Sequence, residues 1–219
     1  MFRRSIPGIL VVATLTGGCL RKDTTHTLYL SPDGALRWIT EEVGVRSDEA
    51  DPGARLAEEQ AYIGSALIGA HPVALALRAV AADGPVRTTV IREERPFHVV
   101  TDAQFFRADR VFERLFKESG IAAVVTLDDA DDRRRLRIRM DFTGGVQQRE
   151  SAATVLLEDL EQMRFVMTEG RFVAGGGFDV PERTEALISR EWMARLDEAA
   201  RSRGKIELVL TWTLVGDAL

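Results

Sequence analysis

The sequence predicts an α+β fold in which a largely antiparallel sheet is built from hairpins, with amphipathic helices inserted between them. Three observations support this prediction. Segments with strand-like alternation occur in pairs separated by short turns. Segments with apolar residues at helical spacing lie between these pairs. The chain also closes on a strongly alternating segment that runs from Ile206 to Leu214.

The predicted hairpins follow from turn residues that separate alternating segments. Ser31-Pro32-Asp33-Gly34 suits a type I turn, because proline presets φ at the second position and glycine relaxes the exit. This turn joins residues 28–30 to a strand that carries Leu36 and Trp38 on one face. The other expected hairpins join residues 86–91 to 97–100, residues 121–127 to 136–142, and the two halves of 165–173.

The predicted helices begin where a capping residue precedes an amphipathic stretch. Asp51-Pro52 is a start signal, because aspartate caps and proline suits the first helical position. Pro72 should break this helix and open a second one. Thr101 or Asp102 is expected to cap a helix with several phenylalanines on one face. Residues 151–160 favour a helix, and a last amphipathic helix carries Ile188, Trp192, Leu196 and Ala199.

Composition limits the class of protein. The chain has 219 residues, a hydrophobic share of 45% and a formal net charge of -5. The hydrophobic share is that of a globular protein with a substantial core. An acidic chain is a poor candidate for sequence-independent binding to nucleic acid, so no nucleic-acid partner is expected. Cys19 is the only cysteine, so an exported domain would have no internal disulfide.

The amino terminus has the order of a secretory signal. Arg3 and Arg4 precede an apolar run over residues 9–15, and small residues lead to Cys19. The apolar run is too short to span a bilayer as a helix. The sequence therefore predicts export, with residues 1–18 as a signal peptide.

The segment Leu15-Thr16-Gly17-Gly18-Cys19 resembles the lipobox of bacterial lipoproteins, with Thr16 where that family more often has leucine. The resemblance implies cleavage before Cys19 and acyl chains on its sulfur, which would anchor the chain to a membrane. By the same resemblance, Leu20 in place of aspartate favours the outer over the inner membrane. Residues 19–26 are then expected to form a lipidated tether and residues 27–219 a single globular domain, with a possible internal boundary near 144–150.

The sequence offers little support for catalysis or for a bound cofactor. His26, His71 and His98 show no metal-ligand spacing, and no nucleophile motif of the G-x-S-x-G or S-x-x-K type occurs, so neither a catalytic residue nor a metal site is assigned. The acidic loop is a weak calcium candidate that lacks the EF-hand glycine and distal glutamate, and a solvated hairpin tip is the simpler interpretation. Its acids are Asp128, Asp129, Asp131 and Asp132.

Two groups of side chains suggest binding. Arg135, Arg137 and Arg139 should line one face of a strand, within reach of an anionic headgroup, a polysaccharide or a partner. The alternative is a solvated face whose arginines pair with nearby acids. The phenylalanines around the third predicted helix could line a pocket for a lipid or hydrophobic ligand, or form plain core. Phe106 is off their shared face and hints at a second contact.

The leading functional hypothesis is a non-enzymatic envelope lipoprotein that works as a binding or assembly module. Its expected partners are the membrane, through the lipid on Cys19, and an envelope protein, lipid or glycan. The alternative is an envelope hydrolase that uses two facing carboxylates, which leave little signature in a sequence.

Overall fold

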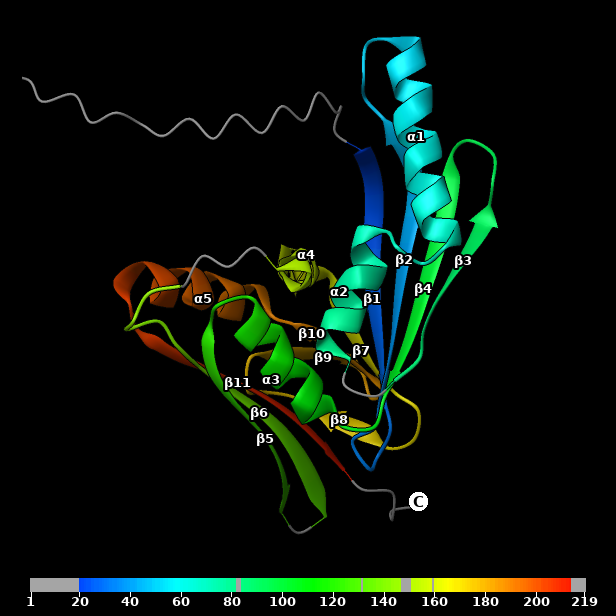
Figure 1. Cartoon of the computed structure of the whole chain (residues 1–219). Coiled ribbons are helices and arrows are strands. Elements are labelled where there is room, and N and C mark those ends of the chain that lie inside the picture. Colours follow the sequence, from blue (N-terminus) through cyan, green and yellow to red (C-terminus); the bar gives the residue numbers. More distant parts are fainter. Residues whose placement is uncertain (1–19, 82–83, 131, 147–150, 159, 214–219) are drawn as a thin grey trace, which may run out of the picture.

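The computed structural model describes residues 20–81, 84–130, 132–146, 151–158 and 160–213. Within these ranges the chain forms two sheets and five α-helices, and most strand pairs are antiparallel (Figure 1). This is the α+β class that the alternating segments predicted. The signal segment, Cys19 and residues 147–150 of the possible boundary lie outside the described residues.

The larger sheet has seven strands in the order β3-β4-β2-β1-β7-β10-β9. Their bounds are β1 (Leu20–Leu30), β2 (Leu36–Ser47), β3 (Val86–Arg92), β4 (Phe97–Phe105), β7 (Met163–Met167), β9 (Phe178–Glu182) and β10 (Glu185–Ile188). The predicted β1–β2 and β3–β4 hairpins are confirmed. Among the described strands, the exception to antiparallel pairing is the β1–β7 pair, which is parallel.

The smaller sheet has four strands in the order β5-β6-β11-β8. They are β5 (Ala122–Ala130), β6 (Arg133–Asp141), β8 (Arg171–Val173) and β11 (Lys205–Thr213). The β5–β6 hairpin and the last strand are confirmed, and β11 pairs with β6 along its whole length. Alternation explains this register, because Leu208 and Leu210 of β11 are buried beside Ile138 and Leu136 of β6.

The helices are α1 (Pro52–Leu67), α2 (Pro72–Val80), α3 (Ala108–Glu118), the short α4 (Val155–Glu158) and α5 (Arg190–Ser202). Short 3₁₀ turns, Ala152–Thr154 and Leu160–Gln162, flank α4. Asp51 caps α1 as predicted, since its carboxylate accepts a hydrogen bond from the amide of Ala54 at 2.7 Å. The helix is interrupted after Leu67, and Pro72 begins α2.

The stretch Pro52–Val80 is long and apolar enough to cross a membrane by length and composition, with a mean hydropathy of 1.5 in its most apolar window. In the structure it comprises α1 and α2, and 44% of that window is buried inside the fold. The buried faces of these helices pack against the seven-stranded sheet and α3. Core packing explains the apolar composition of this stretch.

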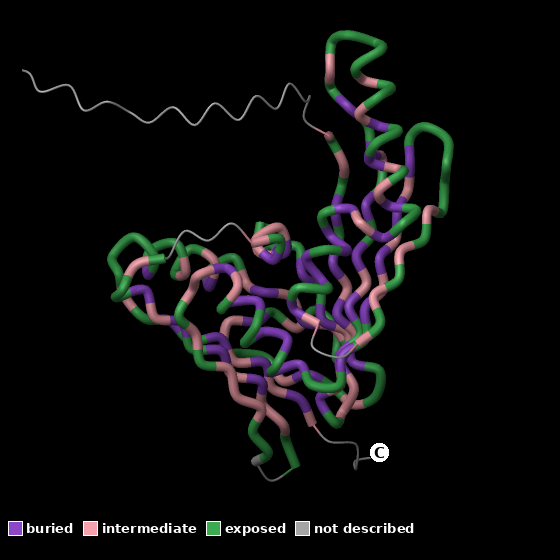
Figure 2. The backbone as a smooth tube through the Cα atoms, viewed as in Figure 1, coloured by how far each residue is buried: buried purple, intermediate pink, exposed green. Residues whose placement is uncertain are grey.

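One hydrophobic core joins the two sheets. It contains Trp38 of β2, Phe112 of α3 and Trp212 of β11, all almost fully buried (Figure 2). A smaller cluster lies under α1 and includes Tyr62 of that helix and Phe97 of β4. The main core therefore contains residues from both sides of the possible boundary near 144–150.

Four sequence predictions need correction. The first is the tether over residues 20–26, which is instead the beginning of β1 and pairs with the end of β2 from Leu20 onward. Polar residues alternate there with buried Thr24 and His26, and the Nδ1 atom of His26 lies within hydrogen-bonding distance of Thr40 and Trp38. The segment looks like a tether because its buried face is polar.

The other three corrections concern strand pairing and the bounds of elements. Ile188, predicted to belong to the last amphipathic helix, is instead the last residue of β10, and α5 begins at Arg190. The two halves of residues 165–173 do not pair, because β7 lies in the larger sheet and β8 in the smaller one. The third helix does not begin at Thr101 or Asp102, since β4 continues to Phe105 and α3 begins at Ala108. In that segment Thr101, Ala103 and Phe105 alternate as buried strand residues, which overrides the helical spacing of the phenylalanines.

Candidate functional site

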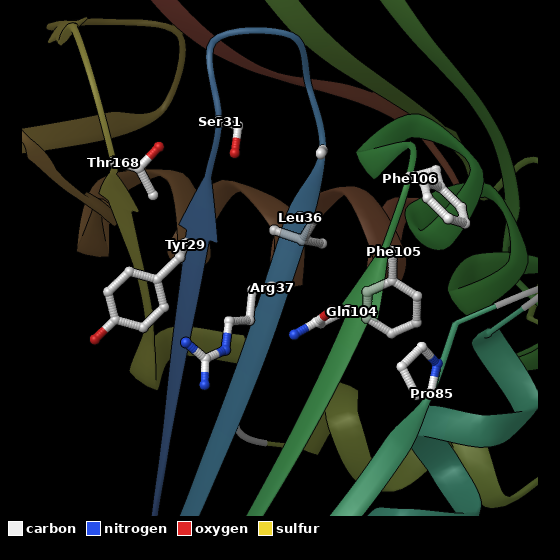
Figure 3. A pocket seen from close by; sticks show the side chains of 10 residues that line it. Tyr29, Ser31, Leu36, Arg37, Pro85, Gln104, Phe105, Phe106 and Thr168 are labelled. Carbon is white, nitrogen blue, oxygen red and sulfur yellow. The ribbon is translucent and has the colours of Figure 1, made fainter.

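A pocket of about 370 Å³ lies at the end of the seven-stranded sheet where β1 ends and β2 begins (Figure 3). Its apolar walls include the rings of Tyr29, Phe105 and Phe106 and the side chain of Leu36. Arg37 and Gln104 add polar groups. This size and mixture are typical of a small-molecule site, in which a few polar groups orient a mainly apolar ligand.

Strand register brings these side chains together. Tyr29 is opposite Arg37 in the β1–β2 pair, and Arg37 is opposite Gln104 in the β2–β4 pair. The turn between β1 and β2 is closed by a 2.9 Å hydrogen bond from the amide of Gly34 to the carbonyl of Ser31. Gly34 has φ +88°, a conformation that glycine adopts at little cost. The turn predicted from the sequence therefore forms one end of the pocket.

Phe106 is the most unusual residue of the pocket, because 78% of it is exposed. It lies between the end of β4 and the start of α3, beside the nearly buried Phe105. Phe97, Phe112 and Phe116 are core residues, as the plainer interpretation of the phenylalanine cluster predicted. Phe106 is separate from these core residues and lines the wall of the pocket.

Arg37 is the charged group of the pocket, and its charge is balanced. Its Nε donates to Oδ1 of Asp102 at 2.9 Å, and its Nη2 donates to Oδ2 at 2.7 Å. These hydrogen bonds and the carboxylate charge raise the pKa of Arg37. Because the guanidinium already has a bidentate partner, an uncharged ligand can bind beside it without leaving it unpaired.

A second group of polar side chains is buried between the seven-stranded sheet and the helices α1 and α2. At its centre, Glu42 of β2 forms an ion pair with Lys22 of β1, and its Oε2 lies 3.3 Å from Nε2 of His71. His71 Nε2 is also 3.1 Å from the hydroxyl of Thr101. The ring of Tyr62 contacts that of His71, edge to face, at 6.0 Å.

The electrostatics of this cluster favour an ionised Glu42. Burial alone would raise its pKa, but hydrogen bonds with His71 and Lys22 and the charge of Lys22 outweigh burial and lower it to about 2. Burial and the Glu42 carboxylate raise the pKa of Tyr62. Glu42 and His71 are 1% and 0% exposed, so a solute has no access to them. The Glu42–Lys22 ion pair joins β2 to β1, and the contact of Glu42 with His71 holds the α1–α2 junction on the sheet.

A more polar groove of about 580 Å³ lies at the start of α5 and bears on the hydrolase alternative. Glu161, Asp179 and Glu191 contribute carboxylates to it, and all three residues are exposed.

The arginines predicted to share a face do so. Arg135, Arg137 and Arg139 alternate with the buried Leu136 and Ile138 on the solvent side of β6. Arg139 and Arg137 approach the same carboxylate oxygen of Glu207, at 2.7 and 3.5 Å. Part of this face therefore follows the alternative of local ion pairs.

The acids of the weak calcium candidate are engaged separately. Asp129 pairs with Arg134, Asp132 lies 3.7 Å from Arg133, and Asp128 accepts a hydrogen bond from Thr126. Asp131 lies outside the described residues. Among the residues that are described, no three His, Cys, Asp or Glu side chains are grouped as metal ligands would be.

Comparison with known proteins adds little to this picture. No family model matches the chain, and no curated protein matches its sequence. Among solved structures, the folded domain of the Mycobacterium tuberculosis LppM protein is similar, with 10% sequence identity over 91% of this chain and 92% of that one. The TM-score of this match is 0.36.

Proposed function

We propose that the protein is an envelope lipoprotein, anchored through Cys19, whose domain binds the apolar part of a small amphipathic molecule in the pocket beside Phe106. The observation that carries the binding function is the exposure of Phe106 on the wall of a largely apolar pocket. A phenylalanine left in water forgoes burial of roughly 1.5–3 kcal/mol, which a ligand covering it would recover. No step in this function requires bond breaking.

The anchor rests on the sequence of the amino terminus. The charged, apolar and small-residue zones, followed by Cys19, match a signal peptide that ends in a lipobox. Several acyl chains on Cys19 would hold the protein stably, because each buried methylene contributes about 0.8 kcal/mol. Of the two membranes of such an envelope, Leu20 after the cysteine favours the outer one.

The beginning of β1 fixes how the pocket would be presented. The first strand residue, Leu20, follows Cys19 directly, so little chain remains between the proposed lipid and the sheet. The pocket lies at the other end of β1, about 35 Å away for eleven strand residues. The binding site would therefore face away from the anchoring membrane, toward soluble ligands or partners of the compartment.

The pocket is tested by titration of the chain from residue 19 onward, carrying Cys19→Ser, with the uncharged apolar dye N-phenyl-1-naphthylamine. We expect saturable fluorescence enhancement and about tenfold weaker dye binding for Phe106→Ala, because part of the apolar contact is lost. Ile68→Ala is the matched control, since Ile68 is 76% exposed but lies at the end of α1. Equal effects of the two substitutions, or no saturable binding, would reject the pocket.

The anchor is tested in cells by metabolic labelling with a fatty acid. The unaltered protein should carry the label and fractionate with membranes, whereas Cys19→Ser should do neither. A labelled, membrane-bound Cys19→Ser protein would contradict the anchor. Because the dye titration uses protein without a lipid, either half of the proposal can fail alone.

A further inference from the structure

The outward face of the four-stranded sheet carries a regular array of basic side chains. Alternate residues of β6 place four arginines in one row on this face, and the strand register adds a basic residue from each of β8 and β11. These six residues, here called the basic face, are Arg133, Arg135, Arg137, Arg139, Arg171 and Lys205.

The charge of this face is opposite to that of the chain. The register places three acids on the same side of the sheet, namely Asp128, Asp141 and Glu207, against the six bases. The whole chain has a net charge of -5. A concentration of positive charge on one face of an acidic protein creates a local potential that attracts anions.

Internal ion pairs use only part of this charge. Lys205 pairs with Asp141 at 2.6 Å, Glu207 is shared by Arg137 and Arg139, and Arg133 lies 3.7 Å from Asp132. Within the described part of the chain, no carboxylate lies within ion-pair distance of Arg135 or Arg171. Donor capacity therefore remains for an external anion.

We propose that the basic face binds an anionic polysaccharide. The four arginines of β6 repeat every second residue, which spaces them about 6.4–6.8 Å apart along the strand. A linear polymer with a carboxylate or phosphate on each repeat can pair with several of them in turn. The centre of a protein interface usually combines arginines with aromatic anchors, and among the described residues the strand register places no aromatic side chain on this face. Here the row of arginines occupies the centre, and β5 adds the exposed Val124 at the edge.

The position of the sheet favours a polymer over the anchoring bilayer. Pro32, in the turn at the far end of β1, accepts hydrogen bonds from Arg134 at 2.9 Å and from Trp212 at 3.3 Å. The four-stranded sheet is therefore attached to the end of β1 that lies away from Leu20 (Figure 1). This step rests on the proposed anchor at Cys19. With that anchor, the four-stranded sheet is attached at the end of β1 that is remote from the lipid.

The test measures binding of the chain from residue 19 onward, carrying Cys19→Ser, to immobilised polygalacturonate, with neutral dextran as the reference. We expect binding to polygalacturonate that weakens as salt rises, because salt screens exposed charges. The triple variant R135Q/R137Q/R139Q should bind about tenfold more weakly. No binding of the unaltered sequence at low salt would overturn the proposal.

A matched variant separates the basic face from net charge. R114Q/R195Q/R201Q removes three exposed arginines from α3 and α5 and changes the net charge equally. We expect it to bind within twofold of the unaltered sequence, and an equal loss in both variants would reject the face. Vesicles containing phosphatidylglycerol form the last arm. Tighter binding to vesicles than to polygalacturonate, lost in R135Q/R137Q/R139Q, would replace the polymer by a membrane. None of these results depends on lipidation or on the dye pocket.

Discussion

The Nε2 atom of His71 lies 3.3 Å from Oε2 of Glu42, and the two side chains are 0% and 1% exposed. His71 precedes α2, whereas Glu42 is in the middle of the seven-stranded sheet. The contact therefore joins the α1–α2 junction to the sheet where the smaller core cluster and the main core meet. A buried contact with an ionised carboxylate makes local stability sensitive to the loss of either partner.

Replacing Glu42 by glutamine should destabilise the fold by about 3 kcal/mol, because removal of one partner leaves buried charge and donors uncompensated. Lys22 is 22% exposed and can recover some hydration, which places the expected loss at the lower end of the range for buried pairs. Glu41→Gln is the matched control, since Glu41 is exposed on the opposite face of β2. Its effect should stay within about 0.5 kcal/mol. Urea unfolding at pH 7 compares the two, and equal losses would show that the cluster has no special role.

The same pair predicts a pH dependence. The pKa of Glu42 is lowered from 4.5 to about 2 in the folded protein, so folding favours its ionised form. The resulting stabilisation is complete above pH 4.5 and is lost as the pH falls toward 2. The difference in unfolding free energy between the unaltered protein and Glu42→Gln should therefore shrink by about 3 kcal/mol over this interval. A constant difference from pH 6 to pH 2.5 would mean that Glu42 is not the ionised partner.

These contacts also show where sequence reasoning stops. Alternation and turn residues were sufficient for the β5–β6 hairpin and for β11, because each depends on neighbours in the chain and on one apolar face. The parallel β1–β7 pair brings His26 beside Met163, and no local pattern encodes a partner so far along the chain. Thr24 and His26 are polar but buried, so the beginning of β1 resembled a tether.

The candidate sites also differ in how far the sequence predicts them, because some depend on one strand and others on distant segments. The arginine row of β6 was readable, because strand periodicity alone places Arg135, Arg137 and Arg139 on one face. Only Phe106 pointed to the pocket, since its walls come from three strands, β1, β2 and β4, and from the connecting segments that carry Ser31, Pro85, Phe106 and Thr168. No local pattern in the sequence pairs Glu42 with His71, and only the packing of α2 on the sheet brings them together.

The cap of α1 should contribute measurably to stability. The Asp51 carboxylate accepts a hydrogen bond from the Ala54 amide. Because α1 is only partly buried, packing contributes less to its stability and the cap contributes more. Asp51→Ala should destabilise the fold by about 1 kcal/mol, whereas Asp51→Asn should retain most of the effect, because asparagine is also a good cap. Urea unfolding of both variants checks this, and an Asp51→Asn variant as weak as Asp51→Ala would show that the negative charge matters more than the hydrogen bond.

Two glycines should respond in opposite ways to substitution by alanine. A Cβ at Gly84 would overlap the carbonyl oxygen of Gln104, which is backbone and cannot rotate away, and it would also approach Phe105. Gly84→Ala should therefore destabilise the fold by about 3 kcal/mol, a size that marks a backbone clash, and should displace the end of β4 that forms the pocket.

A Cβ at Gly64, inside α1 and exposed, would meet nothing within 4 Å. Gly64→Ala should stabilise the protein by about 0.5–1 kcal/mol, because alanine favours the helix and restricts the unfolded chain. Thermal unfolding and titration with N-phenyl-1-naphthylamine distinguish the two. If Gly84→Ala keeps both its stability and its dye affinity, the chain before β3 does not approach β4 as closely as the structure shows, and the adjoining pocket wall is not rigid.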